Sequence, residues 1–128
     1  MRLLLDTHAF LWFINDSPEL PRSVKDLLED DASDLYLSVA SVWEMAIKSS
    51  PGKLQLPGPI AVFIPAQLQL NNLNLMPIEV AHLGLIETFP LHHKDPFDRL
   101  LAAQSLTENI PIVSIDAALD PYGVQRIW

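Results

Sequence analysis

The chain has 128 residues, of which 49% are hydrophobic, and this size and composition predict one globular domain over residues 1–128. It has no cysteine, which excludes disulfides, thiolate zinc sites and cysteine nucleophiles and suits a reducing compartment. The formal net charge of −8 argues against a protein that binds nucleic acid only by neutralising phosphates, unless convergent carboxylates take up divalent cations and invert the local charge.

Strand and helix patterns alternate from the start of the chain. Residues 2–6 form an apolar run of strand length, as expected for a strand buried on both faces of a parallel sheet. Residues 7–16 can form a short helix, and a second helix lies within residues 17–31. Residues 34–38 are the next predicted strand, and residues 41–52 follow as a helix.

The second half of the chain continues the alternation. Residues 53–57 can pair as a short edge segment, and residues 58–72 predict a helix that Pro65 disturbs. The remaining strands are expected at residues 73–78, 110–116 and 124–128, and the remaining helices at residues 79–89 and from Asp95 to about Asn109.

This alternation predicts a three-layer α/β/α fold with a central parallel sheet of about five strands. No segment reaches the roughly 18 uninterrupted apolar residues that a membrane-spanning helix needs. Asp6 and His8 interrupt the apolar N-terminus and no small-residue cleavage site follows, so no signal peptide is expected. The sequence therefore predicts a soluble, cytoplasmic protein.

Two aspartates follow apolar strands. Asp6 closes the first predicted strand and Asp116 the fourth, and in open α/β sheets ligands bind beyond the carboxyl ends of the strands. If these two strands are neighbours, both carboxylates face one cleft. Aspartate also favours turns, which explains either residue alone, and for the pair both explanations stay open.

Glu44 lies early in the helix that follows the second strand. It has two structural explanations, a capping box with Ser41 and an i,i+4 ion pair with Lys48. A helix after the second strand, however, starts at the same edge of the sheet as Asp6. An acid in its first turns can therefore reach the cleft.

Asp95 and Asp98 lie at the start of the last helix. Asp95 before Pro96 fits an N-cap with proline at the first helical position, and Asp98 at the third position suits the helix dipole. We expect the cap to occupy the side chain of Asp95. The negative charge of Asp98 can interact favourably with the helix dipole while its side chain also points into the cleft.

Four convergent carboxylates make an oxygen-only site, which suits Mg²⁺ or Mn²⁺ better than Zn²⁺. Without a counterion, such carboxylates repel one another and resist ionisation, and a cation resolves this conflict. A site of this kind can polarise a phosphoryl oxygen, activate a water and stabilise the leaving oxygen. The residues therefore point to hydrolysis of a phosphodiester.

The chain resembles a known family in four motifs. In order and spacing it is similar to the PIN-domain ribonucleases of the VapC toxin type, through LLLDTHAFLW, SVASVWEMAIK followed by GKLQLP, HHKDPFDRLLAAQ, and IVSID followed by YGV. The resemblance covers nearly the full chain. Each motif is weak alone, but the four in this order are specific.

The resemblance implies a sheet with the first strand in its middle and a Mg²⁺- or Mn²⁺-dependent endoribonuclease, the toxin of a type II toxin–antitoxin pair held inactive by a VapB- or Phd-like antitoxin. By motif matching, the three core acids and a fourth, more variable one are Asp6, Glu44, Asp98 and Asp116. The family activates a water with these acids and needs no protein nucleophile. Thr7 takes a position where the family often has a hydroxyl that helps hold a metal-bound water.

Four basic residues are candidates to contact the RNA backbone, although a solvated surface charge explains each equally well; they are Arg99, Lys48, Lys53 and Lys94. His92 and His93, on the loop before the last helix, can contact RNA or a metal, but we favour the interpretation that they are simply exposed. Trp12 and Trp43 occupy apolar helical positions and are expected in the core rather than stacked on bases.

The apolar segment at residues 59–70 can form a homodimer face, as in relatives, or be buried as core. Two other functions compete with the nuclease. A PIN scaffold without catalysis would act only as a binding partner, but all four acids are present. A receiver-like phospho-acceptor domain would need an aspartate after the third strand, and none follows it.

Overall fold

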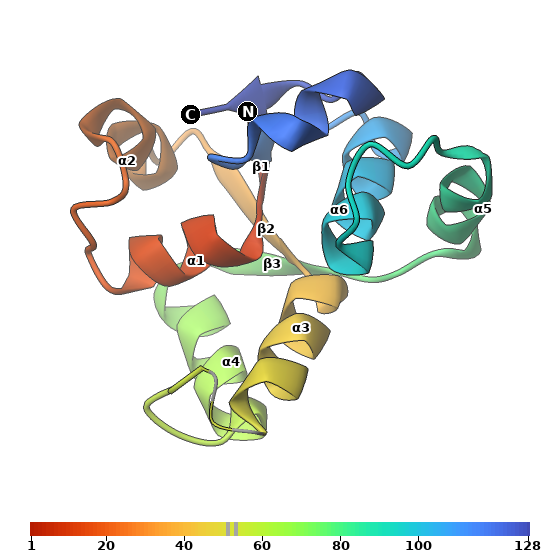
Figure 1. Ribbon diagram of the computed structural model, residues 1–128. Coiled ribbons are helices and arrows are strands. Elements are labelled where there is room, and N and C mark those ends of the chain that lie inside the picture. Colours follow the sequence, from red (N-terminus) through yellow and green to blue (C-terminus); the bar gives the residue numbers. More distant parts are fainter. Residues whose placement is uncertain (51, 53) are drawn as a thin grey trace.

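A parallel sheet forms the centre of the computed structural model, which describes residues 1–50, 52 and 54–128 (Figure 1). Within these residues the sheet has five strands in the order β3-β2-β1-β4-β5. They are β1 (Arg2–Leu5), β2 (Asp34–Ser38), β3 (Leu73–Met76), β4 (Ile112–Val113) and β5 (Arg126–Ile127). The first strand lies in the middle, as the family resemblance implied.

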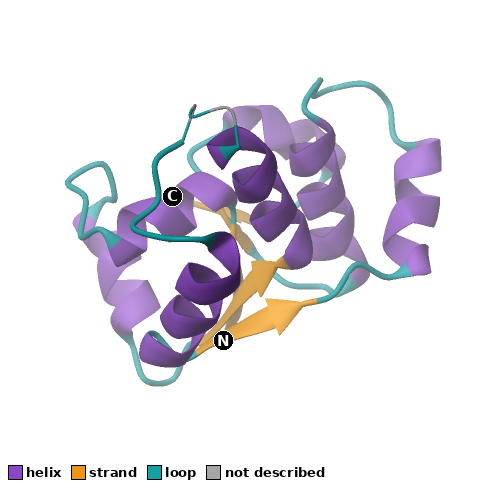
Figure 2. Ribbon diagram, turned by 90° about the horizontal axis from the view of Figure 1, so that it is seen from below, coloured by secondary structure: helices purple, strands orange, loops and turns teal. Residues whose placement is uncertain are grey.

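Every strand pair in the sheet is parallel, so the carboxyl ends of the strands lie along one edge. At the end of β1, Leu5 lies between Leu37 of β2 and Val113 of β4. The two strands nearest the viewer in Figure 2 point the same way. The residues that follow β1, β2 and β4 therefore meet at one edge of the sheet, where α/β folds place their ligands.

Helices cover both faces of the sheet, which confirms the three-layer prediction. Figure 1 shows α1 and α2 on one side of the strands and α5 and α6 on the other. The helices are α1 (Thr7–Ile14), α2 (Arg22–Glu29), α3 (Val39–Ser49), α4 (Ile60–Leu70), α5 (Val80–Thr88) and α6 (Pro96–Thr107), with the short 3₁₀ helix η1 (Ala117–Tyr122) before the last strand.

Two apolar layers hold the helices to the sheet, one on each face. Leu3 and Leu5 of β1 pack in one layer with Phe10 of α1. Leu4 belongs to the opposite layer, together with Leu101 of α6. All three leucines are fully buried, which is why this strand has a continuous apolar sequence. Burial of each such side chain contributes about 1.5–3 kcal/mol.

A buried polar network ties α6 to the carboxyl ends of β2 and β3. The hydroxyl of Ser38 donates to Oε1 of Gln104 at 2.6 Å, and Nε2 of Gln104 donates to the backbone carbonyl of Pro77 at 3.2 Å. Ser38 and Gln104 are fully buried, so leaving either unpaired would cost about 1–3 kcal/mol. The network fixes the position of the helix that carries Asp98.

Helix α3 begins earlier than predicted. Ser38 is its N-cap and accepts the backbone N–H of Ala40 at 3.0 Å. Ser41, the cap suggested by the sequence, lies inside the helix and is fully buried. The capping box of Ser41 with Glu44 is therefore wrong, and Glu44 lies in the second turn of the helix.

Two predicted strand segments differ from the structure. Of residues 110–116, only Ile112–Val113 pair as β4, because the chain turns beyond this point and Asp116 caps η1. Asp116 therefore lies in the loop after the strand. Residues 54–57 form no strand, and Lys53 lies outside the described residues.

Helix α4 continues unbroken from Ile60 to Leu70 with Pro65 inside it. The predicted disturbance at this proline does not divide the helix. None of the helices in the described part of the chain combines the length and apolar character of a membrane span.

Candidate metal centre

The first acid of the site follows the central strand. Asp6 comes directly after β1, and only 5% of the residue is exposed. Its Oδ1 caps α1 by accepting the backbone N–H of Ala9 at 2.8 Å. Burial raises the pKa of Asp6 and the nearby Glu44 adds to the rise, while hydrogen bonds from Ser114 and Ala9 oppose it. The cap holds the carboxyl group of Asp6 at the edge of the sheet.

Glu44 reaches the same place from α3 and is also almost fully buried. Its Oε1 accepts a hydrogen bond from the hydroxyl of Thr7 at 2.6 Å, and its Oε2 accepts one from the ammonium of Lys48. The predicted i,i+4 ion pair with Lys48 therefore forms. This hydrogen bond raises the pKa of Lys48. In the structure Thr7 fixes the orientation of Glu44, a role that the sequence did not suggest.

Asp95 begins α6, as predicted. Its Oδ1 accepts the backbone N–H of Phe97 at 2.8 Å and that of Asp98 at 3.4 Å, with Pro96 at the start of the helix. Asp98 therefore lies in the first turn, at the end of the helix that faces the site. The side chain of Asp95 is therefore engaged as the N-cap, and the start of the helix directs Asp98 toward the site.

Asp98 is the most perturbed acid in the cluster. Its pKa rises from the ordinary 3.8 to about 7, first because the side chain is partly buried and then because Asp95, Glu44 and Asp6 lie nearby. Only His93 acts in the opposite direction. The repulsion shows that carboxylates from β1, α3 and α6 converge.

Asp116 joins the cluster from the loop after β4. Its backbone N–H donates to the hydroxyl of Ser114 at 3.0 Å, and the side chain of Ser114 also lies near enough to Asp6 to lower the pKa of that acid. Partial burial acts to raise the pKa of Asp116, but hydrogen bonds from His93 and the backbone of Ala118 outweigh it and lower the pKa. Ser114, which sequence reasoning missed, thus links two of the acids.

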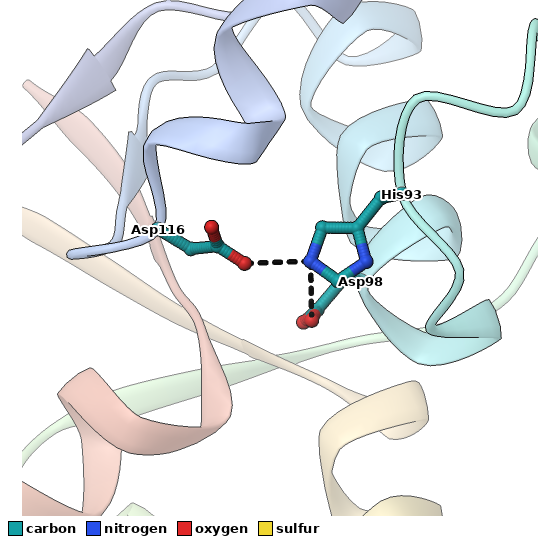
Figure 3. Close-up of side chains that lie close together, drawn as sticks. All are labelled: His93, Asp98 and Asp116. Carbon is teal, nitrogen blue, oxygen red and sulfur yellow. Dashed lines mark hydrogen bonds and ion pairs between the residues drawn. The ribbon is translucent and has the colours of Figure 1, made fainter.

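The structure also brings His93 into the site, so the prediction of a simply exposed residue is wrong. Its Nε2 lies 2.6 Å from Oδ2 of Asp116 and 3.3 Å from Oδ2 of Asp98 (Figure 3). Only 16% of its side chain is exposed. His92 does remain exposed, with its ring against Tyr122.

The donor set fits a divalent cation. A ring nitrogen of His93 and carboxylate oxygens of Asp98 and Asp116 lie within 4.8 Å of one another, and the two carboxylates are candidate ligands. Asp6 and Glu44 are close enough to raise the pKa of Asp98, which indicates excess negative charge at this point. The set is dominated by carboxylate oxygens, as Mg²⁺ and Mn²⁺ prefer.

Comparison with known proteins identifies the family. The family model described as the PIN domain matches residues 3–123. The chain belongs to the PIN domain family. PIN domains are in general nucleases that use divalent metals, which agrees with the acidic cluster described above. No curated protein matches the chain in sequence.

Three solved structures share the fold of this PIN domain. VapBC2 from Rickettsia felis, bound to a DNA fragment from the promoter, has a TM-score of 0.70 and 16% identity over 99% of this chain and 98% of its own. VapBC-1 from nontypeable Haemophilus influenzae has a TM-score of 0.65 and 14% identity over 99% and 97%. A toxin–antitoxin complex from Klebsiella pneumoniae has a TM-score of 0.57 and 15% identity over 89% and 86%.

The basic residues of the PIN domain differ in their exposure to solvent and in their ion-pair and hydrogen-bond partners. Lys48 is held by Glu44, with 43% of its side chain exposed, and Lys94 is exposed without an ion pair to any described residue. Arg99 is half-buried and donates to the backbone carbonyl of Phe89 at 3.4 Å. Lys53 lies outside the described residues. Lys94 is thus the most accessible of the described candidates.

The two tryptophans have different environments. Trp12 is partly buried and packs against the core and against Trp128, with ring centroids 5.7 Å apart. Trp43 is 54% exposed and lies edge-on to Phe97 at 4.9 Å. The prediction that Trp43 belongs to the core is wrong, because the buried side of α3 runs through its neighbours Glu44 and Met45.

Proposed function

We propose that this PIN domain is a metal-dependent endoribonuclease and the toxin of a VapBC-type toxin–antitoxin system. One observation carries the proposal: Asp6, Glu44 and Asp98 converge at the carboxyl edge of the sheet, with Asp116 beside them, and their crowding raises the pKa of Asp98 to about 7. Such crowding is costly for folding and is relieved by a cation.

Asp6, Glu44, Asp98 and Asp116 would hold Mg²⁺ or Mn²⁺, directly or through water. When bound, the ion supplies a Lewis acid that polarises the phosphodiester and lowers the pKa of a water. The backbone N–H of Ala9 fixes one oxygen of Asp6, and Thr7 fixes one oxygen of Glu44. These contacts hold the acids in place before any substrate arrives, which lowers the cost of ordering the site.

RNA must approach this site against a net charge of −8. Lys48 lies within the cluster, and Lys94 lies on the loop next to it. We assign the phosphate contacts to these two ammonium groups, because Arg99 is engaged with backbone. In the proposed hydrolysis a water oxygen would bond to the phosphorus, the P–O bond to the departing ribose oxygen would break, and a proton lost by the water would be balanced by one taken up by that oxygen, so no side chain would become bonded to the substrate.

We propose a VapB- or Phd-like antitoxin as the protein partner and the cytoplasm as the location. The VapBC and toxin–antitoxin structures that share the fold support this partner. Helix α4 supports a homodimer, because Val62 and Leu70 are 67% and 77% exposed while Phe63 and Ile64 face the core. An exposed apolar side on a helix favours contact with another chain.

The test is cleavage of labelled single-stranded RNA by the purified protein in Mg²⁺, in Mn²⁺ and in a chelator. We expect cleavage with either ion, none in the chelator, and recovery when excess ion is restored. Cleavage that persists in the chelator would contradict the metal-dependent mechanism, and cleavage of DNA alone would contradict the substrate. Co-expression with a small reading frame immediately upstream should suppress the activity if that frame encodes the antitoxin.

A further inference from the structure

The loop before α6 holds His93 in one orientation. The Nδ1 atom of its ring accepts the backbone N–H of Asp95 at 3.0 Å. A ring nitrogen that accepts a hydrogen bond carries no proton, so the neutral imidazole has its proton on Nε2. The backbone therefore makes Nε2 a donor, and this donor faces the Oδ2 atoms of Asp116 and Asp98 at 2.6 and 3.3 Å (Figure 3).

A donating Nε2 is not available as a metal ligand, because a ligating imidazole nitrogen offers a lone pair. Ligation would require the proton on Nδ1, where it would face the N–H of Asp95. That arrangement loses a hydrogen bond and sets two donors against each other. The hydrogen bonds of His93 therefore exclude it as a metal ligand.

The position of Nε2 also restricts where a cation can bind. A divalent ion that bridged the Oδ2 atoms of Asp98 and Asp116 would have to lie about 2.0–2.1 Å from each of them. The Nε2 atom of His93 already lies 3.3 Å from the Oδ2 atom of Asp98 and 2.6 Å from that of Asp116, so a bridging ion would compete with its N–H for the same oxygens. We therefore expect an ion beside Asp6, Glu44 and Asp98, and no second ion shared by Asp98 and Asp116 while His93 keeps its place.

We propose that His93 is a positioning residue that donates its Nε2 proton to Asp116 and lies against Asp98, takes the place of a second cation, and so limits the site to a single divalent ion. This inference rests on the proposed metal site and extends it.

The first test is the tautomer of His93 in the metal-free, full-length protein, read from the NMR correlations between ring nitrogens and carbon-bound ring protons. We expect the Nε2–H tautomer for His93, and the same tautomer after Mg²⁺ is added. A proton on Nδ1 in either state would overturn the proposal. This measurement needs no RNA, no activity and no variant.

The second test counts bound Mn²⁺ by electron paramagnetic resonance without RNA. We expect about one ion per chain in the wild type and in His93→Gln, whose amide N–H can still donate, and about two in His93→Ala, which exposes two facing carboxylates. His92→Ala is the matched control, because this neighbouring histidine is exposed, and it should bind about as much Mn²⁺ as the wild type.

Two ions in the wild type, an imidazole nitrogen coupled to Mn²⁺, or one ion in a folded His93→Ala variant would each overturn the proposal. Circular dichroism establishes whether His93→Ala folds, and if it does not, the wild-type count and the tautomer decide. A wild type that binds no Mn²⁺ contradicts the proposed metal centre and with it the single-ion claim. In that case the tautomer still tests the geometry: an Nε2–H tautomer would mean that the arrangement of His93 is right and the proposed metal function is wrong.

Discussion

Replacing Asp98 with asparagine should stabilise the metal-free protein at neutral and alkaline pH while it removes the proposed nuclease activity. The reason is that Asp98 is an acid in an unfavourable place: burial and three neighbouring carboxylates raise its pKa to about 7. Asparagine has nearly the same shape and no charge. It therefore removes the repulsion and also removes a proposed metal ligand.

The size of the effect follows from the two pKa values of Asp98, 3.8 ordinarily and about 7 in the folded protein. Below pH 3.8 the carboxyl is protonated in both states and has no effect on stability. As the pH rises from there to about 7, the unfolded chain ionises and the folded one does not, so stability is lost, and above about 7 the loss is constant. At about 1.36 kcal/mol for each pH unit across this window of pKa values, the loss of stability is slightly more than about 4 kcal/mol. Solvent reaches 23% of the side chain and screens the repulsion, so we expect about 2 kcal/mol.

The assay is urea unfolding of wild type and Asp98→Asn in a chelator at pH 5 and pH 8. The variant should be more stable by about 2 kcal/mol at pH 8 and by clearly less at pH 5. Asp120→Asn is the control of opposite sign, because Asp120 pairs with Arg126, which lowers its pKa, and this variant should gain no stability. Equal stability of wild type and Asp98→Asn at pH 8 would refute the inference that carboxylates crowd Asp98.

Three further predictions concern the supports of the site. Thr7→Val removes the hydrogen bond to buried Glu44. It should lower the free energy of unfolding in urea by about 1–3 kcal/mol and weaken Mn²⁺ binding by about 10–100-fold. Unchanged Mn²⁺ affinity would contradict the inference that Thr7 orients Glu44. Phe10→Ala should lower the free energy of unfolding by about 3–5 kcal/mol, because Phe10 is fully buried. Trp43→Ala should lower it by less than about 1 kcal/mol, because Trp43 is exposed. Similar losses of stability for the two variants in thermal unfolding would contradict the exposure of Trp43. Mg²⁺ at a hundred times its dissociation constant should stabilise the wild type by about 2.7 kcal/mol and Asp98→Asn by much less, as followed by calorimetry.

Much of the fold could be predicted because individual elements have local signals. The strand at residues 34–38 matches β2, and the apolar run at residues 2–6 predicted a strand buried on both faces, as β1 is. Asp95 and Pro96 marked the start of α6 through cap chemistry alone. In these cases neighbouring residues determine the structure, so a single sequence is sufficient.

Other features depend on residues that are distant in the sequence and could not be predicted. His93 enters the site only because η1, more than twenty residues later, places Asp116 against it. The one local sign was its position two residues before the cap, where Nδ1 can accept the N–H of Asp95. Trp43 is exposed because α3 turns Glu44 and Met45 inward, which follows from packing against the sheet and not from the residue types.

The central claim, that the acids hold the ion that makes this PIN domain a ribonuclease, is tested most directly by comparing Asp6→Asn with Asp95→Asn. Both variants replace one carboxylate by an amide near the same edge, but Asp6 lies in the cluster, whereas Asp95 serves as the N-cap of α6, and asparagine also caps well. Magnesium-dependent RNA cleavage and Mn²⁺ binding should both fall sharply in Asp6→Asn and largely persist in Asp95→Asn. Equal cleavage by wild type and a folded Asp6→Asn would contradict the account.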